Sequence, residues 1–348
     1  MKKLYTTLLA ALAITFVTAQ DVHYTQFYNS PLTLNPAMTG LTQGTFRVGV
    51  HYRNQWFTGV NNGFFRSPFQ TPSIYFDMPI KVFRNDHVGV GAVILADLAG
   101  AGSMNTYMGM VSGSYIKSLG KDHNHQLSAG FQVGYTQLRI KQDDLHWASQ
   151  AQNNEFNSSL PAGIALKPNV SYVNLNVGLM YYGRIIPKLD LYAGAAFFNA
   201  TTPKYNLGVN EAKKDLNFRW NISAGLDAKL GKQNRFHLLP SALFMRQSTA
   251  DQLNIGMGLG YDITREANLT LGGYARVNNL TNKDAAADAG IAYVALDVKG
   301  FKIGASYDFT ASKFKTAGPG VGGLEISLTY TGHAKNYDLR NIMFCPRF

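Results

Sequence analysis

Catalysis and metal binding need particular side chains brought close together. Histidine can serve both as an acid or base and as a metal ligand, and this sequence has eight histidines. None of them has the spacing of a hydrolase, protease or zinc motif. His123 and His125 could turn toward one metal ion, but their neighbours Asp122 and Asn124 are typical of an exposed hairpin loop, and a closed site needs more ligands. The sequence therefore predicts no metal site, no cofactor and no catalytic residues.

A single cysteine, Cys345, excludes an internal disulfide framework and a multi-cysteine metal site. We interpret it as a free thiol or a partner contact. The glycine-rich run 318–323 lacks the lysine and the helix of a phosphate-binding loop, so we expect a turn there. Because no nucleophile, base and orienting group form a recognisable set, we do not expect an enzyme.

Charged side chains on strands offer the remaining chemistry. Arg47 and Arg53 share one face of the predicted first strand, and Glu325 lies on the last strand, which becomes its neighbour if the sheet closes. Because buried charges usually pair, we hypothesise that Arg53 or Arg47 contacts Glu325 or Asp308 across the closure. Separate, solvated charges are the alternative.

The elements that must position these charges begin after a targeting segment. Lys2 and Lys3 precede an apolar run, and Val17-Thr18-Ala19 form a small-residue cleavage site. The apolar run covers about fourteen residues, fewer than the roughly 20 that a spanning helix needs. The pattern predicts a signal peptide over 1–19, export, and a mature chain that begins near Gln20.

The mature chain alternates apolar and polar residues with the period of a β-strand. Leu127, Phe131 and Tyr135 lie on one face of such a segment, while Gln132 and Thr136 lie on the other. We place fourteen segments of this kind at residues 44–56, 72–83, 87–96, 103–117, 126–141, 172–184, 188–200, 217–230, 234–246, 252–263, 267–278, 287–298, 300–310 and 323–332.

An even number of alternating strands is typical of a bacterial membrane barrel, whose strands carry only a weak hydropathy signal. The mean hydropathy is -0.11, and 34 Gly, 21 Phe and 19 Tyr favour strands, turns and aromatic belts. We therefore predict an all-β fold, a single closed antiparallel transmembrane β-barrel of the outer membrane over 44–332. Soluble β-sandwich domains are the competing fold, but no linker or composition shift divides the chain.

Connections and ends complete the predicted organisation. Residues 297–300 allow only a tight turn, whereas 142–171 and 202–217 are long polar loops, which should face outward. Residues 20–43 precede the first strand without strand periodicity, and 333–348 form a C-terminal tail. The N-terminal segment is expected to be a plug inside the barrel or a periplasmic docking arm, with Phe27, Tyr28, Asn35 and Pro36 as its candidate contact residues.

The formal net charge of the chain is +11, but its lysines and arginines are scattered, without the clustered patch that binds phosphate backbones. We expect no nucleic-acid partner. Anionic lipid headgroups or an acidic protein are the expected contacts, with solvated loops and a charged lumen as the alternative explanation.

Several short motifs are distinctive in combination. They are Gln26-Phe27-Tyr28-Asn29-Ser30-Pro31-Leu32, Asn35-Pro36-Ala37 with Gly40, Tyr52-Arg53-Asn54-Gln55-Trp56, Ser73 with Asp77-Met78-Pro79, Val88-Gly89-Val90-Gly91-Ala92 with Asp97, Ser306-Tyr307-Asp308, Gly322-Gly323-Leu324-Glu325-Ile326-Ser327-Leu328 and Cys345-Pro346-Arg347-Phe348. With these motifs the chain closely resembles the PorP/SprF family of type IX secretion system membrane proteins.

This resemblance implies an outer-membrane barrel that works with the type IX secretion system. Some members of the family associate with the secretion and gliding machinery, and others are paired with a large secreted adhesin whose export or surface attachment they support. The expected partners are therefore proteins of that system or a secreted adhesin, together with outer-membrane lipid. The alternative function is a transporter or channel for a small solute, hydrophobic solutes included.

Overall fold

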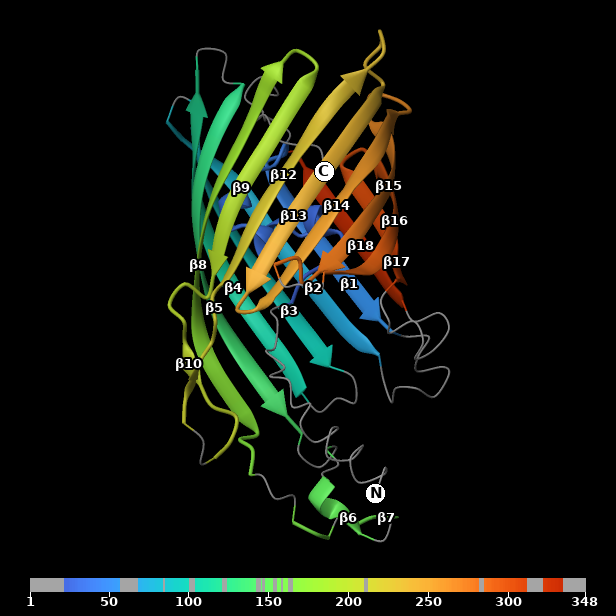
Figure 1. Ribbon diagram of the computed structural model, residues 1–348. Helices are drawn as coiled ribbons and strands as arrows, with labels where there is room; N and C mark the ends of the chain where they lie inside the picture. The colour runs from blue at the N-terminus through green and yellow to red at the C-terminus, as the bar shows by residue number, and fades with distance from the viewer. Residues whose placement is uncertain are drawn as a thin grey trace.

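The computed structural model describes residues 22–56, 68–83, 85–99, 104–120, 124–141, 145, 148–152, 155–157, 159–161, 165–209, 212–281, 285–311 and 322–333. Fourteen of its strands form one closed antiparallel barrel (Figure 1). The expected signal peptide, Cys345 and nearly all of the C-terminal tail lie outside these residues.

The barrel strands are β1 (Phe46–Gln55), β2 (Phe69–Phe83), β3 (Asp86–Ala99), β4 (Met104–Leu119), β5 (His125–Ile140), β8 (Asn169–Ile186), β9 (Leu189–Phe198), β12 (Arg219–Leu230), β13 (Phe236–Gln247), β14 (Ala250–Asp262), β15 (Ala267–Asn278), β16 (Ala286–Val298), β17 (Phe301–Thr310) and β18 (Gly322–Gly332). Each pairs with its neighbours along the chain, and β1 pairs with β18 to close the sheet. The predicted fourteen-strand antiparallel barrel is confirmed. β2 and β8 begin three residues earlier than expected, because the outward positions of these extensions hold polar residues, Gln70 on β2 and Asn169 and Ser171 on β8.

Alternation along each strand separates a lipid face from a lumen face. On β5 the Phe131 side chain points outward and is 58% exposed, whereas Gln132 points inward and is fully buried. Exposed Leu, Ile, Val and Phe recur on the outer face of the other strands. Because these side chains would be costly to leave in water, the outer face is that of a barrel surrounded by lipid.

The two ends of the barrel differ in their connections. At the end that we call the turn end, six connections are short, from two residues between β8 and β9 to five between β12 and β13. At the opposite end, the loop end, residues 141–168 join β5 to β8 and residues 199–218 join β9 to β12. These are the two predicted long loops. They carry the short strands β6 (Ala151–Gln152), β7 (Glu155–Phe156), β10 (Lys204–Tyr205) and β11 (Lys214–Asp215), of which β6 and β7 project beyond the wall (Figure 1).

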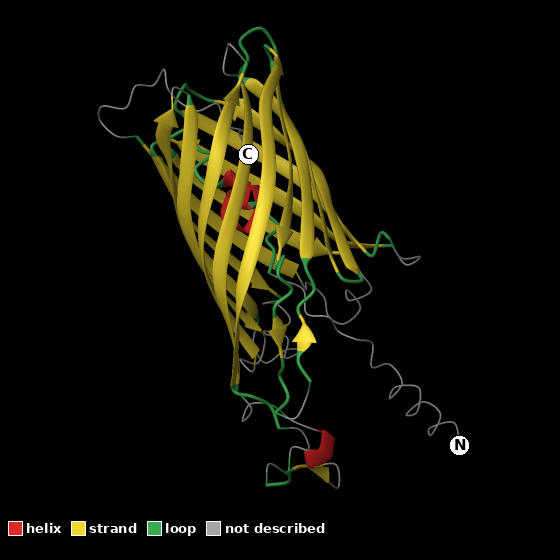
Figure 2. Ribbon diagram, turned by 90° about the vertical axis from the view of Figure 1, so that its left-hand side faces the viewer, coloured by secondary structure: helices red, strands yellow, loops and turns green. Residues whose placement is uncertain are grey.

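Residues 22–45, the N-terminal segment, lie inside the barrel. The segment contains η1 (Phe27–Asn29), α2 (Pro31–Leu34) and η2 (Pro36–Met38), which are the helices within the lumen in Figure 2. Pro31 and Pro36 each occupy the first turn of a helix, where a missing N–H is tolerated. The Asn35 side chain accepts a hydrogen bond from the Ala37 N–H at 2.9 Å and so caps η2. In the described part of the chain, each helix is too short or too polar to cross a membrane.

The N-terminal segment runs along the lumen from one end to the other. At the loop end, Arg219, the first residue of β12, donates a hydrogen bond to the Val22 carbonyl at 3.1 Å. At the turn end, the Thr45 N–H donates to the carbonyl of Gly332, the last residue of β18, at 2.9 Å. The chain therefore crosses the barrel once before its first strand begins.

Candidate functional site

Glu325 is the central acceptor of a buried network between the barrel wall and the N-terminal segment. Its carboxylate lies 2.7 Å from Arg53 Nη1 and 3.2 Å from His51 Nε2, both on β1. The backbone N–H groups of Thr25 and Gln26 donate to the same carboxylate at 2.7 and 2.9 Å. Since Glu325 is only 1% exposed, these contacts replace the water that would otherwise solvate the charge.

Asp308 extends the network to the neighbouring strands. Its Oδ2 atom accepts from Thr25 Oγ1 at 2.9 Å and lies 3.5 Å from Arg53 Nη2 and 2.9 Å from Arg276 Nη1. Arg276 in turn contacts Asp288 at 2.6 Å. The cluster therefore holds two arginines and three carboxylates, and Thr25 lies at its centre.

Arg47 lies away from this cluster, nearer the turn end. It forms a paired contact with Asp77 on β2, with its Nη2 atom 2.7 Å from Oδ2 and its Nε atom 2.9 Å from Oδ1. The Gly40 N–H donates to Asp77 at 2.7 Å, and Arg47 reaches the Met38 carbonyl at 3.4 Å. The structure thus brings Arg53 to Glu325 and Asp308, and it brings Arg47 to Asp77 instead.

The candidate residues of the N-terminal segment contact the wall as well. Asn35 Nδ2 donates to the Leu179 carbonyl on β8 at 2.9 Å and lies within hydrogen-bond reach of the Ala195 carbonyl on β9 at 3.3 Å. Pro36 packs so closely against Gly130 on β5 that a Cβ atom at that glycine would overlap the Pro36 carbonyl. Asn35 and Pro36 therefore hold η2 against this side of the barrel.

Phe27 and Tyr28 fill the centre of the lumen. Their rings meet edge to face at 5.1 Å, and the Tyr28 ring contacts Tyr293 at 5.2 Å and Tyr274 at 5.9 Å. Tyr28 lies in the N-terminal segment, and burial raises the pKa of its phenol well above the usual value. The phenol is therefore neutral in the folded protein at physiological pH.

Some residues of the site had no contact role predicted from the sequence, although Gln26 and Asp77 belong to the motifs quoted above. Asp77 and Arg276 both occupy lumen-facing positions on predicted strands, so a search for inward charges on every strand would have found them. Thr25 and Gln26 contact Glu325 mainly through backbone atoms, which any residue type carries. Their role had no signal in the sequence.

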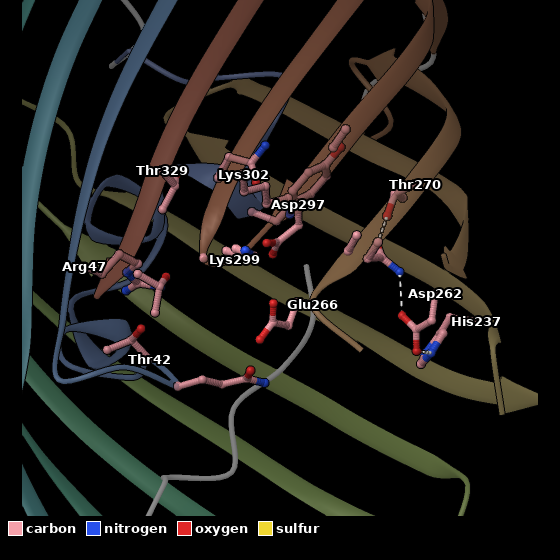
Figure 3. A pocket seen from close by; sticks show the side chains of 18 of the residues that line it. Thr42, Arg47, His237, Asp262, Glu266, Thr270, Asp297, Lys299, Lys302 and Thr329 are labelled. Atoms are coloured by element: carbon pink, nitrogen blue, oxygen red, sulfur yellow. Dashed lines mark hydrogen bonds and ion pairs between the residues drawn. The ribbon is translucent and has the colours of Figure 1, made fainter. Parts of the chain in front are cut away.

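Between the N-terminal segment and the turn end the lumen opens into a vestibule, a cavity of about 590 Å³. Figure 3 shows Arg47, Thr329, Lys299 and Lys302 on one side of it, with Glu266 and Asp297 nearer its centre. On the other side the buried His237 lies between two carboxylates, 2.6 Å from Asp227 and 3.2 Å from Asp262. The floor of the vestibule is formed by Tyr28, Asn29, Thr42 and Gln43 of the N-terminal segment.

The histidines of the described residues do not gather into a metal centre, and no group there combines three or more His, Cys, Asp or Glu ligands. His125 instead shares a 2.8 Å hydrogen bond with the Tyr181 hydroxyl, while His123 lies outside the described residues.

A family model described as "Type IX secretion system membrane protein PorP/SprF" matches residues 16–330, which include the N-terminal segment and all of the barrel except the last two residues of β18. The chain belongs to the PorP/SprF family. Membership and fold together make this protein an outer-membrane β-barrel associated with type IX secretion, and the family is not a known enzyme class. A search of curated proteins finds no match.

Solved structures of other membrane barrels resemble this PorP/SprF protein in fold. A deltaS2 mutant of the TodX monoaromatic hydrocarbon channel is similar, with a TM-score of 0.52, 10% identity, and coverage of 88% of this chain and 94% of that chain. A Pseudomonas aeruginosa FadL homologue is similar with a TM-score of 0.52, 12% identity, and coverage of 86% and 93%. At this identity the likeness concerns the fold alone.

Proposed function

We propose that this PorP/SprF barrel supports the secretion or surface attachment of a partner protein of the type IX system, and that it does not conduct solutes. The observation that carries the proposal is the N-terminal segment, which lies in the lumen and is bound to the wall by buried charges and hydrogen bonds. In this proposal residues 20–43 are a plug, 44–332 are the barrel, and an exported precursor loses residues 1–19.

Contacts of the plug with many strands favour a fixed plug over a mobile one. Ser114 on β4 and Ser128 on β5 donate to the carbonyls of Thr39 and Ala37, each at 2.6 Å. Three strands along from β5, Asn221 on β12 donates to the Leu34 carbonyl at 3.1 Å. Removing the plug would leave these groups without their partners and would take two backbone N–H donors from Glu325, which is costly inside a barrel.

A plugged barrel leaves its two ends as the surfaces on which a protein partner can bind. By the rule that long loops of bacterial barrels face outward, the loop end faces the cell surface and the turn end faces the periplasm. The loop end therefore suits a secreted protein, and the turn end suits a component of the secretion apparatus.

A channel for a small hydrophobic solute is the second candidate, because the similar TodX structure is named a monoaromatic hydrocarbon channel. The vestibule argues against it. Its lining is rich in charged and polar side chains, including Asp262, Glu266, Lys299 and Lys302, whereas sites for hydrophobic ligands are lined mainly by apolar side chains.

Two measurements on the purified mature protein separate the candidates. We expect no single-channel current and no solute-dependent swelling of liposomes that contain the barrel, together with co-purification of a secreted type IX substrate from producing cells. Steady flux of a hydrophobic solute without any co-purifying protein would establish the channel and overturn the proposal. A variant that lacks residues 22–43 is the control, because it should conduct in the same liposomes.

A further inference from the structure

The turn end carries a ring of cations. Each of its six short connections contains an exposed lysine or arginine or closely follows one. Among the described residues of that end, these cations are accompanied by a single exposed carboxylate, Glu266. The ring, which we call the cation ring, consists of Lys81, Lys117, Lys188, Lys232, Arg235, Arg265 and Lys299. One member is partly neutralised, because Lys117 Nζ lies 2.7 Å from Asp86.

Two members of the cation ring line the vestibule, which opens along the barrel axis away from the surrounding lipid. Arg265 is in the connection between β14 and β15, Lys299 is in the connection between β16 and β17, and both line the cavity mouth. Phospholipid headgroups surround the outside of a barrel and do not fill its axis. An anionic ligand for these two side chains must therefore enter from the periplasmic side along the barrel axis.

The walls of the vestibule carry uncharged polar side chains as well as the charged ones. Thr42, Asn268, Thr270, Thr329 and Thr331 line it with hydroxyl and amide groups. Such groups both donate and accept hydrogen bonds, as the main chain of a polypeptide does. The volume of about 590 Å³ falls within the range of ligand cavities, and it is large enough for a short stretch of extended chain.

The arrangement of charge also disfavours a small free anion. Arg265 and Lys299 stand at the mouth, Arg47 and Lys302 line the cavity farther in, and the carboxylates of Asp262, Glu266 and Asp297 also line it. A compact anion inside would therefore have carboxylates as well as cations for neighbours. An extended segment can instead keep its carboxylates at the mouth and place its main chain inside.

We propose that the cation ring and the vestibule together form a docking site for an acidic polypeptide segment of a periplasmic protein. Arg265 and Lys299 pair with carboxylates of the segment at the mouth, and the threonine and asparagine side chains bind its main chain. The remaining ring members supply a long-range field that speeds encounter and weakens with salt. The inference rests on the proposed function only in taking the partner to be a protein.

A binding experiment on the full mature chain tests the site. The probe is a fluorescein-labelled ten-residue peptide of glutamate, serine and glycine, measured by fluorescence anisotropy with the barrel in nanodiscs of neutral phosphatidylcholine. We expect saturable binding at low salt that weakens as NaCl increases, and no binding of a matching lysine peptide. The double variant R265E/K299E should bind at least about tenfold more weakly, since both mouth cations become repulsive.

The double variant K213E/K214E is the matched control, because it makes the same change of net charge at exposed residues of the loop end. It should bind the acidic peptide as the wild type does. Equal losses in both double variants, or no binding of the acidic peptide at low salt, would overturn the docking site. Heat-modifiable migration on gels verifies folding, and the neutral variant R265Q/K299Q, with a smaller expected loss, serves if the reversed variant does not fold.

Lipid binding is the competing explanation, and a second arm of the test addresses it. Phosphatidylglycerol nanodiscs could raise the temperature of the heat-modifiable transition in the wild type but not in R265E/K299E. If they do so while both proteins bind the peptide equally well, the two cations are lipid contacts and the proposal is wrong. If the peptide does not bind but a secreted protein still co-purifies with the barrel, the docking site falls and the proposed function stands.

Discussion

Arg53 on the first barrel strand and Glu325 on the last are directly opposed in the β1–β18 ladder, with their charged groups 2.7 Å apart. The same carboxylate receives the backbone N–H groups of Thr25 and Gln26 from the N-terminal segment. One side chain therefore takes part both in closing the barrel and in holding the lumen segment. Changes at Glu325 should affect both.

Replacing Glu325 with Gln should loosen the N-terminal segment. The amide keeps the shape of the side chain but removes the charge that offsets Arg53, and losing one partner of a buried ion pair costs roughly 3 kcal/mol. We expect a lower temperature for the heat-modifiable transition and intermittent single-channel currents that the wild type lacks. E266Q, at an exposed turn residue, is the control and should behave as the wild type does.

Exchanging the two charges, in R53E/E325R, tests whether the pair alone matters. We expect only partial recovery relative to E325R, because an arginine at 325 cannot accept the N–H groups of Thr25 and Gln26. Unchanged folding in E325R, together with no improvement in the exchanged variant, would show that the pair contributes nothing.

Gly130 should not tolerate alanine. A Cβ atom there would overlap the Pro36 carbonyl, so η2 or the strand must shift, at a cost of roughly 1–3 kcal/mol. Gly109 on the lipid face is the matched control, because a Cβ atom there meets nothing within 4 Å. Urea midpoints of G130A and G109A measure the difference. Equal midpoints would mean that η2 does not press on the wall at this point.

Asn35 should require an amide in particular. Aspartate keeps an oxygen that can accept from the Ala37 N–H but has no N–H to donate to Leu179, and it adds a buried charge. We expect N35D to be less stable than N35A in the same urea titration and to expose the N-terminal segment, with its Phe27 and Tyr28, to chymotrypsin. Equal stability of N35D and wild type would show that the amide donor makes no contribution.

The raised pKa of the Tyr28 phenol leads us to expect a loss of stability at alkaline pH. Burial raises its pKa above the unfolded value of about 10, so the neutral form stabilises the fold fully below that pH. The contribution falls as pH rises from about 10 toward the folded pKa, since the unfolded chain then releases the proton more readily. Unfolding temperatures between about pH 8 and pH 12 should fall less steeply in Y28F than in the wild type.

The strands were predictable because a membrane barrel imposes the same two-sided pattern on each of them. Residues such as Phe131 and Gln132 face lipid and lumen in turn, so the period of two marks strand and face together. The short helices around Pro31 and Pro36 were not predicted, because each spans only a few residues and is stabilised by surroundings that lie far away in the chain.

Charge partners were only partly predictable. Closing the sheet makes the first and last strands neighbours, which limited the partners of Arg53 to a few candidates, including Glu325. The register of the strands determines which residue faces Arg47. It stands opposite Thr331 on β18 and opposite Asp77 on β2, so its carboxylate partner comes from β2 and not from β18. Register depends on the exact ends of the turns, which alternation alone does not determine.

The contact between Thr25 and Glu325 joins residues 300 positions apart, and its acceptor belongs to the final strand. The N-terminal segment thus precedes every strand in the chain, yet its binding site is complete only when β18 has joined the sheet. The first part of the chain to be made is therefore the last to be fully bound. A bound N-terminal segment indicates that the barrel of that molecule has closed.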